Sequence, residues 1–191
     1  MSLSRAVAAR ARKVRLLVMD VDGVLTDGRM VLSERGDELK SFHSRDGVAV
    51  TLARRAGLRT AFVTGEKSAV AQARADKLGV DVVVPGARRK GEALEELCTQ
   101  FGVPLEASAY IGDDLLDVPA LQRAGLAIGV ADAAPEVIEI AHLVTRARGG
   151  QGALRECVES ILRAQGTWTD AVEAYVTEHG GWPRRGRREP R

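Results

Sequence analysis

The segment VRLLVMDVDGVLTDG, Val14–Gly28, decides the fold because an apolar run rich in β-branched residues ends abruptly in Asp20 and Asp22. Such a run predicts a buried strand of a parallel sheet, which places both carboxylates at the carboxyl end of the strand. Ligands bind at that edge in open α/β sheets. Two carboxylates so close repel each other unless a cation lies between or beside them. The segment therefore predicts a site for a hard divalent cation, a combination that suggests phosphoryl chemistry.

The rest of the chain alternates between helix and strand. Four glycines, at a spacing of about 23 residues, stand where an expected helix passes into an expected strand, at Gly57, Gly79, Gly102 and Gly125. Glycine readily adopts the left-handed conformation that ends a helix. The expected strands cover 14–20, 59–64, 81–84, 107–111, 126–130 and 142–145, and the expected helices cover 46–56, 67–78, 89–101, 114–124, 134–141, 151–165 and 167–178. This order predicts an α/β fold of three layers, a Rossmann-like parallel sheet with helices on both faces.

Two segments interrupt the alternation. Residues 28–43 suggest two short strands about a turn at 34–37, a hairpin inserted after the first strand. A two-stranded hairpin is marginal in water by itself, so we expect it to pack against something, with a neighbouring subunit as the natural candidate. Residues 180–191 are rich in arginine and lack an apolar period, which predicts a basic flexible tail after a single domain at 1–179.

Composition excludes several classes of function. The 191 residues carry a net charge of +2, but five arginines and one glutamate in the tail give it +4 and leave the remainder at −2. No basic face or aromatic platform favours nucleic-acid binding, and no apolar run is long enough to cross a membrane. The basic N-terminus lacks the apolar core of a secretory signal, and the two cysteines are far apart. We therefore expect a cytoplasmic protein that binds neither nucleic acid nor a membrane.

Polar residues also follow other strands of the expected sheet. Thr64 and Gly65 follow the second strand, Asp113 follows the fourth, and Lys90 opens a helix between them. Because the carboxyl ends of parallel strands are neighbours, we expect these residues to meet the two aspartates of the first strand on one edge of the sheet.

Three of these carboxylates suit the two steps of phosphate ester hydrolysis. Asp20 can attack phosphorus and form an acyl phosphate. Asp22 can protonate the leaving alcohol and then deprotonate the hydrolytic water. Asp20 and Asp113 can hold Mg²⁺, together with the backbone carbonyl of Asp22.

The remaining groups can bind the phosphate or support the metal. Thr64 and the amide of Gly65, at the start of a helix, can donate hydrogen bonds to phosphate oxygens, and Lys90 can offset negative charge and hold the nucleophile. Asp114 and Asp117, in the segment after Asp113, can support the metal ligands or can simply be acids in the first turn of a helix.

Four motifs occur in an order that resembles the haloacid dehalogenase superfamily of phosphohydrolases. They are DVDGVLTDG, VTG, the isolated Lys90 and GDDLLD. The resemblance implies a Mg²⁺-dependent phosphatase with Asp20, Asp22, Thr64 and Lys90 as catalytic residues. It adds Gly23 and Gly65 to the groups that bind phosphate.

Further segments resemble a small capless subfamily of that superfamily. The hairpin, FHSRDG at 42–47 and ARGGQGALRE at 147–156 are similar to phosphatases of 3-deoxy-manno-octulosonate 8-phosphate and of nine-carbon 2-keto-3-deoxy acid 9-phosphates. The resemblance implies a homotetramer without cap domains. Its hairpins would form a shared barrel, and the C-terminal segment of a neighbour would cover each active site, so that the sites lie at subunit interfaces.

The substrate branch depends on the residue after Thr-Gly. The eight-carbon branch tends to have arginine there, whereas this chain has Glu66, followed by Arg74 and Lys77. In the nine-carbon branch the equivalent residues are linked around the substrate, so the resemblance favours a nine-carbon acid. Arg45 is a further candidate for contact with substrate or with a neighbouring loop. Without the resemblance, Arg74 and Lys77 indicate only a solvated helix face.

Two other interpretations fit parts of the pattern. A phospho-accepting receiver domain also brings carboxylates, threonine and lysine together on a parallel sheet, but it places a lone aspartate after its third strand. Here the third strand ends in Pro85-Gly86. The other interpretation is a catalytically silent member of the fold that serves as a partner domain. A silent domain would not need the catalytic residues, yet every catalytic residue type is present, so this interpretation accounts for the sequence less well than a phosphatase does.

Overall fold

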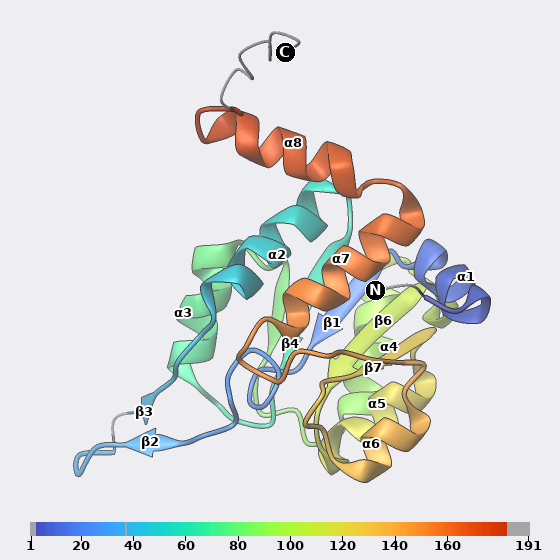
Figure 1. Cartoon of the computed structure of the whole chain (residues 1–191). Coiled ribbons are helices and arrows are strands. Elements are labelled where there is room, and N and C mark those ends of the chain that lie inside the picture. The colour runs from blue at the N-terminus through green and yellow to red at the C-terminus, as the bar shows by residue number, and fades with distance from the viewer. Residues whose placement is uncertain (1–2, 37, 183–191) are drawn as a thin grey trace, which may run out of the picture.

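A six-stranded parallel sheet forms the centre of the computed structural model, which describes residues 3–36 and 38–182 (Figure 1). Its strands, in spatial order, are β5 (Val82–Val84), β4 (Arg59–Val63), β1 (Leu16–Met19), β6 (Ser108–Gly112), β7 (Leu126–Gly129) and β8 (Leu143–Val144). Every neighbouring pair is parallel. All four residues of β1 are buried, as its unbroken apolar run predicts. The predicted fold class is confirmed.

Helices cover both faces of the sheet (Figure 1). One layer contains α1 (Arg5–Lys13), α2 (Ser44–Arg55), α3 (Ala69–Leu78) and α7 (Ala153–Gln165), and α8 (Trp168–Glu178) packs on α2 and α7. The opposite layer contains α4 (Lys90–Phe101), α5 (Val118–Arg123) and α6 (Pro135–Ile140), and short 3₁₀ turns lie at η1 (Leu105–Ala107) and η2 (Leu115–Asp117). The expected helix at 114–124 is thus divided into η2 and α5. No described helix is both long enough and apolar enough to cross a membrane.

Three of the four glycines predicted to end helices in the left-handed region have positive φ. Gly57, Gly79 and Gly102 have positive φ, and the last two are left-handed caps. The prediction was wrong at Gly125, because α5 ends in extended backbone at Ala124. A Cβ atom at Gly125 would lie 2.2 Å from the carbonyl oxygen of Glu106, so this glycine permits a close approach of two backbones.

Asp46 stabilises a helix other than its own. It lies in the first turn of α2, which begins at Ser44 with His43 as its cap, two residues before the expected start at 46. The buried carboxylate of Asp46 instead accepts hydrogen bonds from the amides of Gly152 (3.2 Å) and Arg155 (2.8 Å) at the start of α7. It joins two segments that lie more than a hundred residues apart in the chain.

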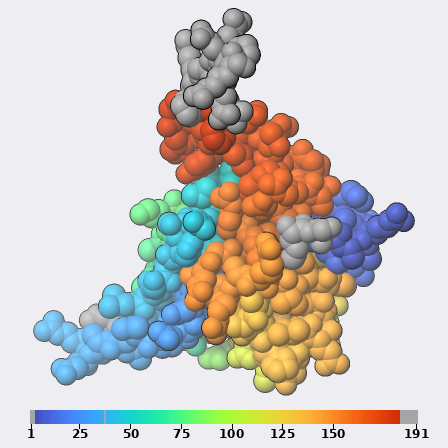
Figure 2. Space-filling model, viewed as in Figure 1, coloured from blue at the N-terminus to red at the C-terminus, as the bar shows by residue number. Residues whose placement is uncertain are grey.

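A hairpin projects from the body of the molecule (Figure 2). It consists of the antiparallel strands β2 (Val31–Leu32) and β3 (Glu38–Leu39), within the predicted insertion at 28–43. Among the described residues this is the one insertion into the alternation of strands and helices, and no cap domain is present. The predicted tail falls largely on residues 183–191, which lie outside the described part of the chain.

Candidate active site

The carboxyl ends of β1, β4 and β6 bring the predicted residues to one edge of the sheet. Asp20 directly follows β1, Thr64 follows β4 and Asp113 follows β6. With Lys90, the first residue of α4, they line a cleft of about 280 Å³. The convergence that the sequence predicted from three separate strands is therefore present in the single chain.

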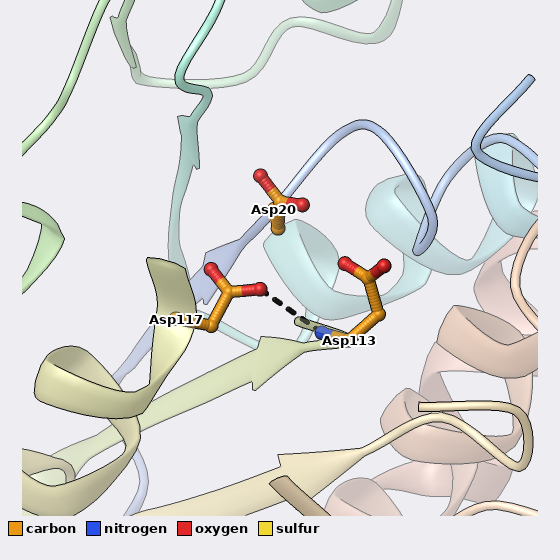
Figure 3. A group of neighbouring side chains, drawn as sticks. All are labelled: Asp20, Asp113 and Asp117. Atoms are coloured by element: carbon orange, nitrogen blue, oxygen red, sulfur yellow. Dashed lines mark hydrogen bonds between the residues drawn. The ribbon is translucent and has the colours of Figure 1, made fainter. Parts of the chain in front are cut away.

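The carboxylates of Asp20, Asp113 and Asp117 point toward one another (Figure 3). An oxygen of each lies within 4.8 Å of the other two. Burial is the main cause that raises the pKa of Asp20 and of Asp113 above their ordinary values, and the negative charges of their neighbours add to it. Such a cluster requires a compensating cation.

Lys90 supplies one such cation. Its side chain is 3% exposed, and the ammonium group donates to Asp20 at 2.6 Å and to Asp117 at 2.7 Å. Burial alone would lower the pKa of Lys90, but the two carboxylates outweigh it and raise that pKa, so the lysine remains charged. The ammonium group contacts Oδ1 of Asp20 and not Oδ2. Lys90 can therefore hold the predicted nucleophile without covering it.

Asp117 is the best-connected acid of the cluster. It accepts from Lys90, from the hydroxyl of Tyr110 at 2.7 Å, and from the amides of Asp113 and Asp114. No sequence motif points to Tyr110, a residue of β6 whose side chain is buried. Burial, reinforced by the negative charge of Asp117, raises the pKa of Tyr110 well above its ordinary value. Both oxygens of Asp117 are thus already used within the protein.

Asp114 lies at the surface, in contrast to Asp117. Its side chain accepts from the amide of Leu115 and caps the η2 turn, to which Asp117 contributes the reciprocal bond of a capping box. The sequence treated these two acids as similar candidates for support of the metal. Within the described residues the contacts favour Asp117 as the supporting group and Asp114 as a cap.

Asp113 has the features of a metal ligand. Its buried Oδ1 has no hydrogen-bond partner in the described part of the chain, although buried polar atoms are almost always paired. A divalent cation would supply that partner, and a set of carboxylate oxygens suits Mg²⁺. Gly23, at φ +97°, lies directly beneath it: a Cβ atom there would be 2.0 Å from Oδ2 of Asp113. Glycine is therefore required at position 23 for Asp113 to reach the cluster.

Asp22 lies between the hairpin and the end of β4. Its Oδ1 accepts from Lys40 Nζ at 2.5 Å, and its Oδ2 lies 3.4 Å from Thr64 Oγ1. Lys40 enters from the stem of the hairpin and was not selected from the sequence, because a lone lysine in a polar segment carries no signal. The predicted proton shuttle is thus held on two sides.

The loop after β4 forms another wall of the cleft. The hydroxyl of Thr64 accepts from the amide of Glu66 at 3.1 Å, and Gly65 and Glu66 line the cleft. The expected helix start at 67 was placed too early, since Ser68 caps a helix that begins at Ala69. The amide of Gly65 therefore belongs to a loop and does not lie at a helix terminus.

The three cationic candidates lie away from this cleft. Arg45 lines a separate hollow beside α7, Lys77 is exposed on α3, and the guanidinium of Arg74 stacks over the ring of Phe42 at 5.2 Å. None of them approaches the aspartate cluster within the described chain. Their assignment to the substrate therefore stays a prediction that needs a neighbouring subunit.

Known proteins similar to this chain are hydrolases and phosphatases. Residues 66–154 match the haloacid dehalogenase-like hydrolase family. The 3-deoxy-D-manno-octulosonate 8-phosphate phosphatase KdsC of Escherichia coli K12 is 40% identical over 88% of this chain and 90% of its own length.

Two solved structures are similar over most of the chain. The 3-deoxy-D-manno-octulosonate 8-phosphate phosphatase of Moraxella catarrhalis, in complex with a magnesium ion, a phosphate ion and a KDO molecule, is 34% identical, with a TM-score of 0.86 over 88% of this chain and 97% of that one. The cobalt-bound deoxy-D-mannose-octulosonate 8-phosphate phosphatase of Haemophilus influenzae is 37% identical, with a TM-score of 0.82 over 84% and 94%.

Proposed function

Because the chain belongs to the haloacid dehalogenase superfamily, in the group of sugar acid phosphatases that its relatives represent, we propose that it hydrolyses the phosphate ester of a 2-keto-3-deoxy sugar acid with Mg²⁺. The chain is a phosphatase, as those relatives are. One observation carries the proposal: Asp20, held by Lys90, lies beside the unpartnered oxygen of Asp113 in one cleft. A nucleophile and a cation site are thereby adjacent.

The proposed reaction has two steps. In the first, the carboxylate oxygen of Asp20 that Lys90 does not contact bonds to phosphorus, the bond from phosphorus to the sugar oxygen breaks, and Asp22 gives that oxygen a proton. In the second, Asp22 takes a proton from the water that attacks the phosphorus of the aspartyl phosphate, and the carboxylate of Asp20 is regenerated. Thr64 and Gly65 are proposed to donate to the phosphate oxygens, and Lys90 offsets their charge.

Mg²⁺ is proposed to bind Asp20, Asp113 and the backbone carbonyl of Asp22. Asp117 does not join this set, because its oxygens already accept from Lys90, Tyr110 and backbone amides. When bound, the cation neutralises the phosphate and the clustered carboxylates. The orphaned oxygen of Asp113 supports this assignment, since it gains a partner only when a cation or proton arrives.

Two substrates of different length remain to be distinguished. The relatives that cleave the eight-carbon 8-phosphate make this the first candidate. The nine-carbon 9-phosphate is the second, because the cleft carries Glu66 where the eight-carbon branch tends to have arginine. A carboxylate and a guanidinium at this position would select different polar groups on the sugar.

A homotetramer in the cytoplasm completes the proposal. Met30, Val31, Leu32 and Leu39 on the hairpin are about half exposed or more, an apolar surface that favours association. A shared barrel of hairpins would bury it and could bring Arg45, Arg74 and Lys77 of one subunit to the cleft of another. The unpaired thiols of Cys98 and Cys157 suit a reducing compartment.

The test is a side-by-side assay of phosphate release from the eight-carbon and nine-carbon phosphates. We expect hydrolysis of at least one, loss of activity in EDTA, and recovery with Mg²⁺. Asp20→Asn should reduce activity to background and keep the circular dichroism spectrum, whereas the exposed Asp170→Asn should match wild type. Glu66→Arg should shift the preference toward the eight-carbon ester. Absence of activity on both esters, or turnover by Asp20→Asn, would contradict the proposal.

A further inference from the structure

The side chain of Lys40 is buried although the hairpin that carries it is exposed. Its side chain is 1% exposed, whereas the adjacent Leu39 is 64% exposed. Successive side chains of a strand point to opposite faces, so the stem of the hairpin presents Leu39 outward and Lys40 inward. The lysine is therefore directed at the active site and not at solvent.

The ammonium group of Lys40 is held by two carboxylates. It lies 2.5 Å from Oδ1 of Asp22 and 2.7 Å from Oε1 of Glu38, and the other oxygen of Glu38 accepts from Ser68 Oγ at 2.5 Å. Burial alone would lower the pKa of Lys40, but these carboxylates raise it, so the ammonium stays charged. A buried charge with such partners has a fixed position.

This contact determines how the carboxylate of Asp22 is oriented. Lys40 holds Oδ1 on the hairpin side, and Oδ2 is then directed toward the hydroxyl of Thr64, which lines the cleft. A general acid must keep one oxygen within hydrogen-bond reach of the atom that receives its proton. Without Lys40 the side chain of Asp22 could rotate about its own bonds and lose that orientation.

We propose that Lys40 is a positioning residue for the hydrolysis: it holds Oδ1 of Asp22 so that Oδ2 exchanges the proton with the leaving oxygen and with water. The inference rests on the proposed role of Asp22 and not on the identity of the sugar. Glu38 and Ser68 act one step further out, because they anchor Lys40 to the loop that caps α3. A lysine that served only to fasten the hairpin would have no such effect on proton transfer.

Positioning of Asp22 and fastening of the hairpin predict different effects of a Lys40 substitution on esters with different leaving groups. An alkyl oxygen needs a proton to depart, whereas nitrophenolate departs without one. Positioned acid–base groups contribute about 10²–10⁴-fold. The second step, hydrolysis of the aspartyl phosphate, is the same for both esters, so the comparison uses kcat/KM, which reports only on the steps up to departure of the leaving group. We therefore expect Lys40→Met to lower kcat/KM for an alkyl phosphate by roughly tenfold or more, and for p-nitrophenyl phosphate by less than about threefold. Lys40→Arg should recover much of the loss, because it keeps the charge and the donors.

The experiment uses the full-length protein with Mg²⁺ and the alkyl phosphate that wild type cleaves fastest in a panel that includes both sugar acid phosphates. Lys13→Met, at the exposed end of α1, is the matched control and should behave as wild type. In an Asp22→Asn background, Lys40→Met should cause no further change in the alkyl-to-aryl ratio, because the group on which it acts is already gone.

Equal losses on both kinds of ester, or no loss on either, would overturn the inference. So would a Lys40→Met effect on the ratio that persists in the Asp22→Asn background. Failure of wild type on both sugar acid phosphates would overturn the proposed substrate only, since the ratio can still be measured on another alkyl ester of the panel. Circular dichroism of each variant confirms that the hairpin substitution has not unfolded the protein.

Discussion

At the scale of single residues, Asp117 organises the cluster that the other two acids use. Its two oxygens accept from Lys90, Tyr110 and the amides of Asp113 and Asp114. These bonds fix the turn that presents Asp113 and fix the ammonium that holds Asp20. An acid whose two oxygens are both used within the protein thereby determines the positions of both the proposed nucleophile and a proposed metal ligand.

We predict that Asp117→Asn destabilises the protein and lowers activity. An amide has one acceptor oxygen, so at least one buried partner of Asp117 loses its bond, and Lys90 keeps only Asp20 as a counter-charge. Breaking a buried ion pair costs about 3–5 kcal/mol, which corresponds to roughly 10 °C in Tm for a chain of this size. Calorimetry checks the value. Asp114→Asn is the matched control and should shift stability by less than about 0.5 kcal/mol, because asparagine caps as well as aspartate; equal effects of the two changes would contradict the distinction.

At the scale of elements, the loop between β8 and α7 supports the loop that follows β1. The amide of Gly150 donates to the carbonyl of Val24 at 2.9 Å, and a Cβ atom at Gly149 would lie 1.7 Å from the carbonyl oxygen of Gly23. Gly23 in turn lies against the carboxylate of Asp113. The glycines of the ARGGQG segment therefore keep two backbones in contact directly behind the metal-binding edge.

We predict that Gly149→Ala lowers both stability and affinity for Mg²⁺. The added methyl group must displace the backbone at Gly23 and with it Asp113, and overpacking of this kind costs about 1–3 kcal/mol. Calorimetric titration with Mg²⁺ and thermal unfolding measure the two effects. Gly129→Ala is the control, since its Cβ would meet a methyl group of Val137 at 3.2 Å, which can adjust. Unchanged Mg²⁺ affinity in Gly149→Ala would show that the contact does not matter for the site.

At the scale of the whole molecule, the hairpin carries both an exposed apolar surface and a residue that contacts the active site. Its outer face carries the exposed apolar side chains and its inner face carries Lys40. A two-stranded ribbon is only marginally stable by itself, so contacts with other subunits would also hold the inner face in place. Assembly and the orientation of Asp22 are coupled through the same short strand in this proposal.

We predict that wild type is a tetramer and that Leu32→Lys with Leu39→Lys produces smaller species. Lysine ammonium groups in the centre of an apolar interface would have to be desolvated without partners. Light scattering should give four times the chain mass for wild type and less for the double variant. Ile138→Lys, a similar change at an exposed apolar residue of α6, is the control and should remain a tetramer. A monomeric variant with full activity would contradict active sites shared between subunits.

The meeting of the candidate site residues at one edge of the sheet could be predicted because their signals are local. A buried strand followed directly by Asp20, by Thr64 or by Asp113 can be read within one segment, and parallel strands then bring these ends together. Lys40, Tyr110 and the distinction between Asp114 and Asp117 could not be predicted. Each depends on a contact whose partner lies on another element, or on the side of a turn to which a carboxylate points.

The sequence by itself therefore determined the fold class and the edge of the sheet at which the candidate site residues meet. The periodicity of apolar residues and the position of a polar residue at the end of a strand are properties of short segments, so they can be recognised without knowledge of distant contacts. Only the tertiary structure decided which charges are paired: Lys90 with Asp20 and Asp117, and Lys40 with Asp22. Pairing depends on distances of a few ångströms between segments far apart in the chain, and only the folded chain fixes those distances.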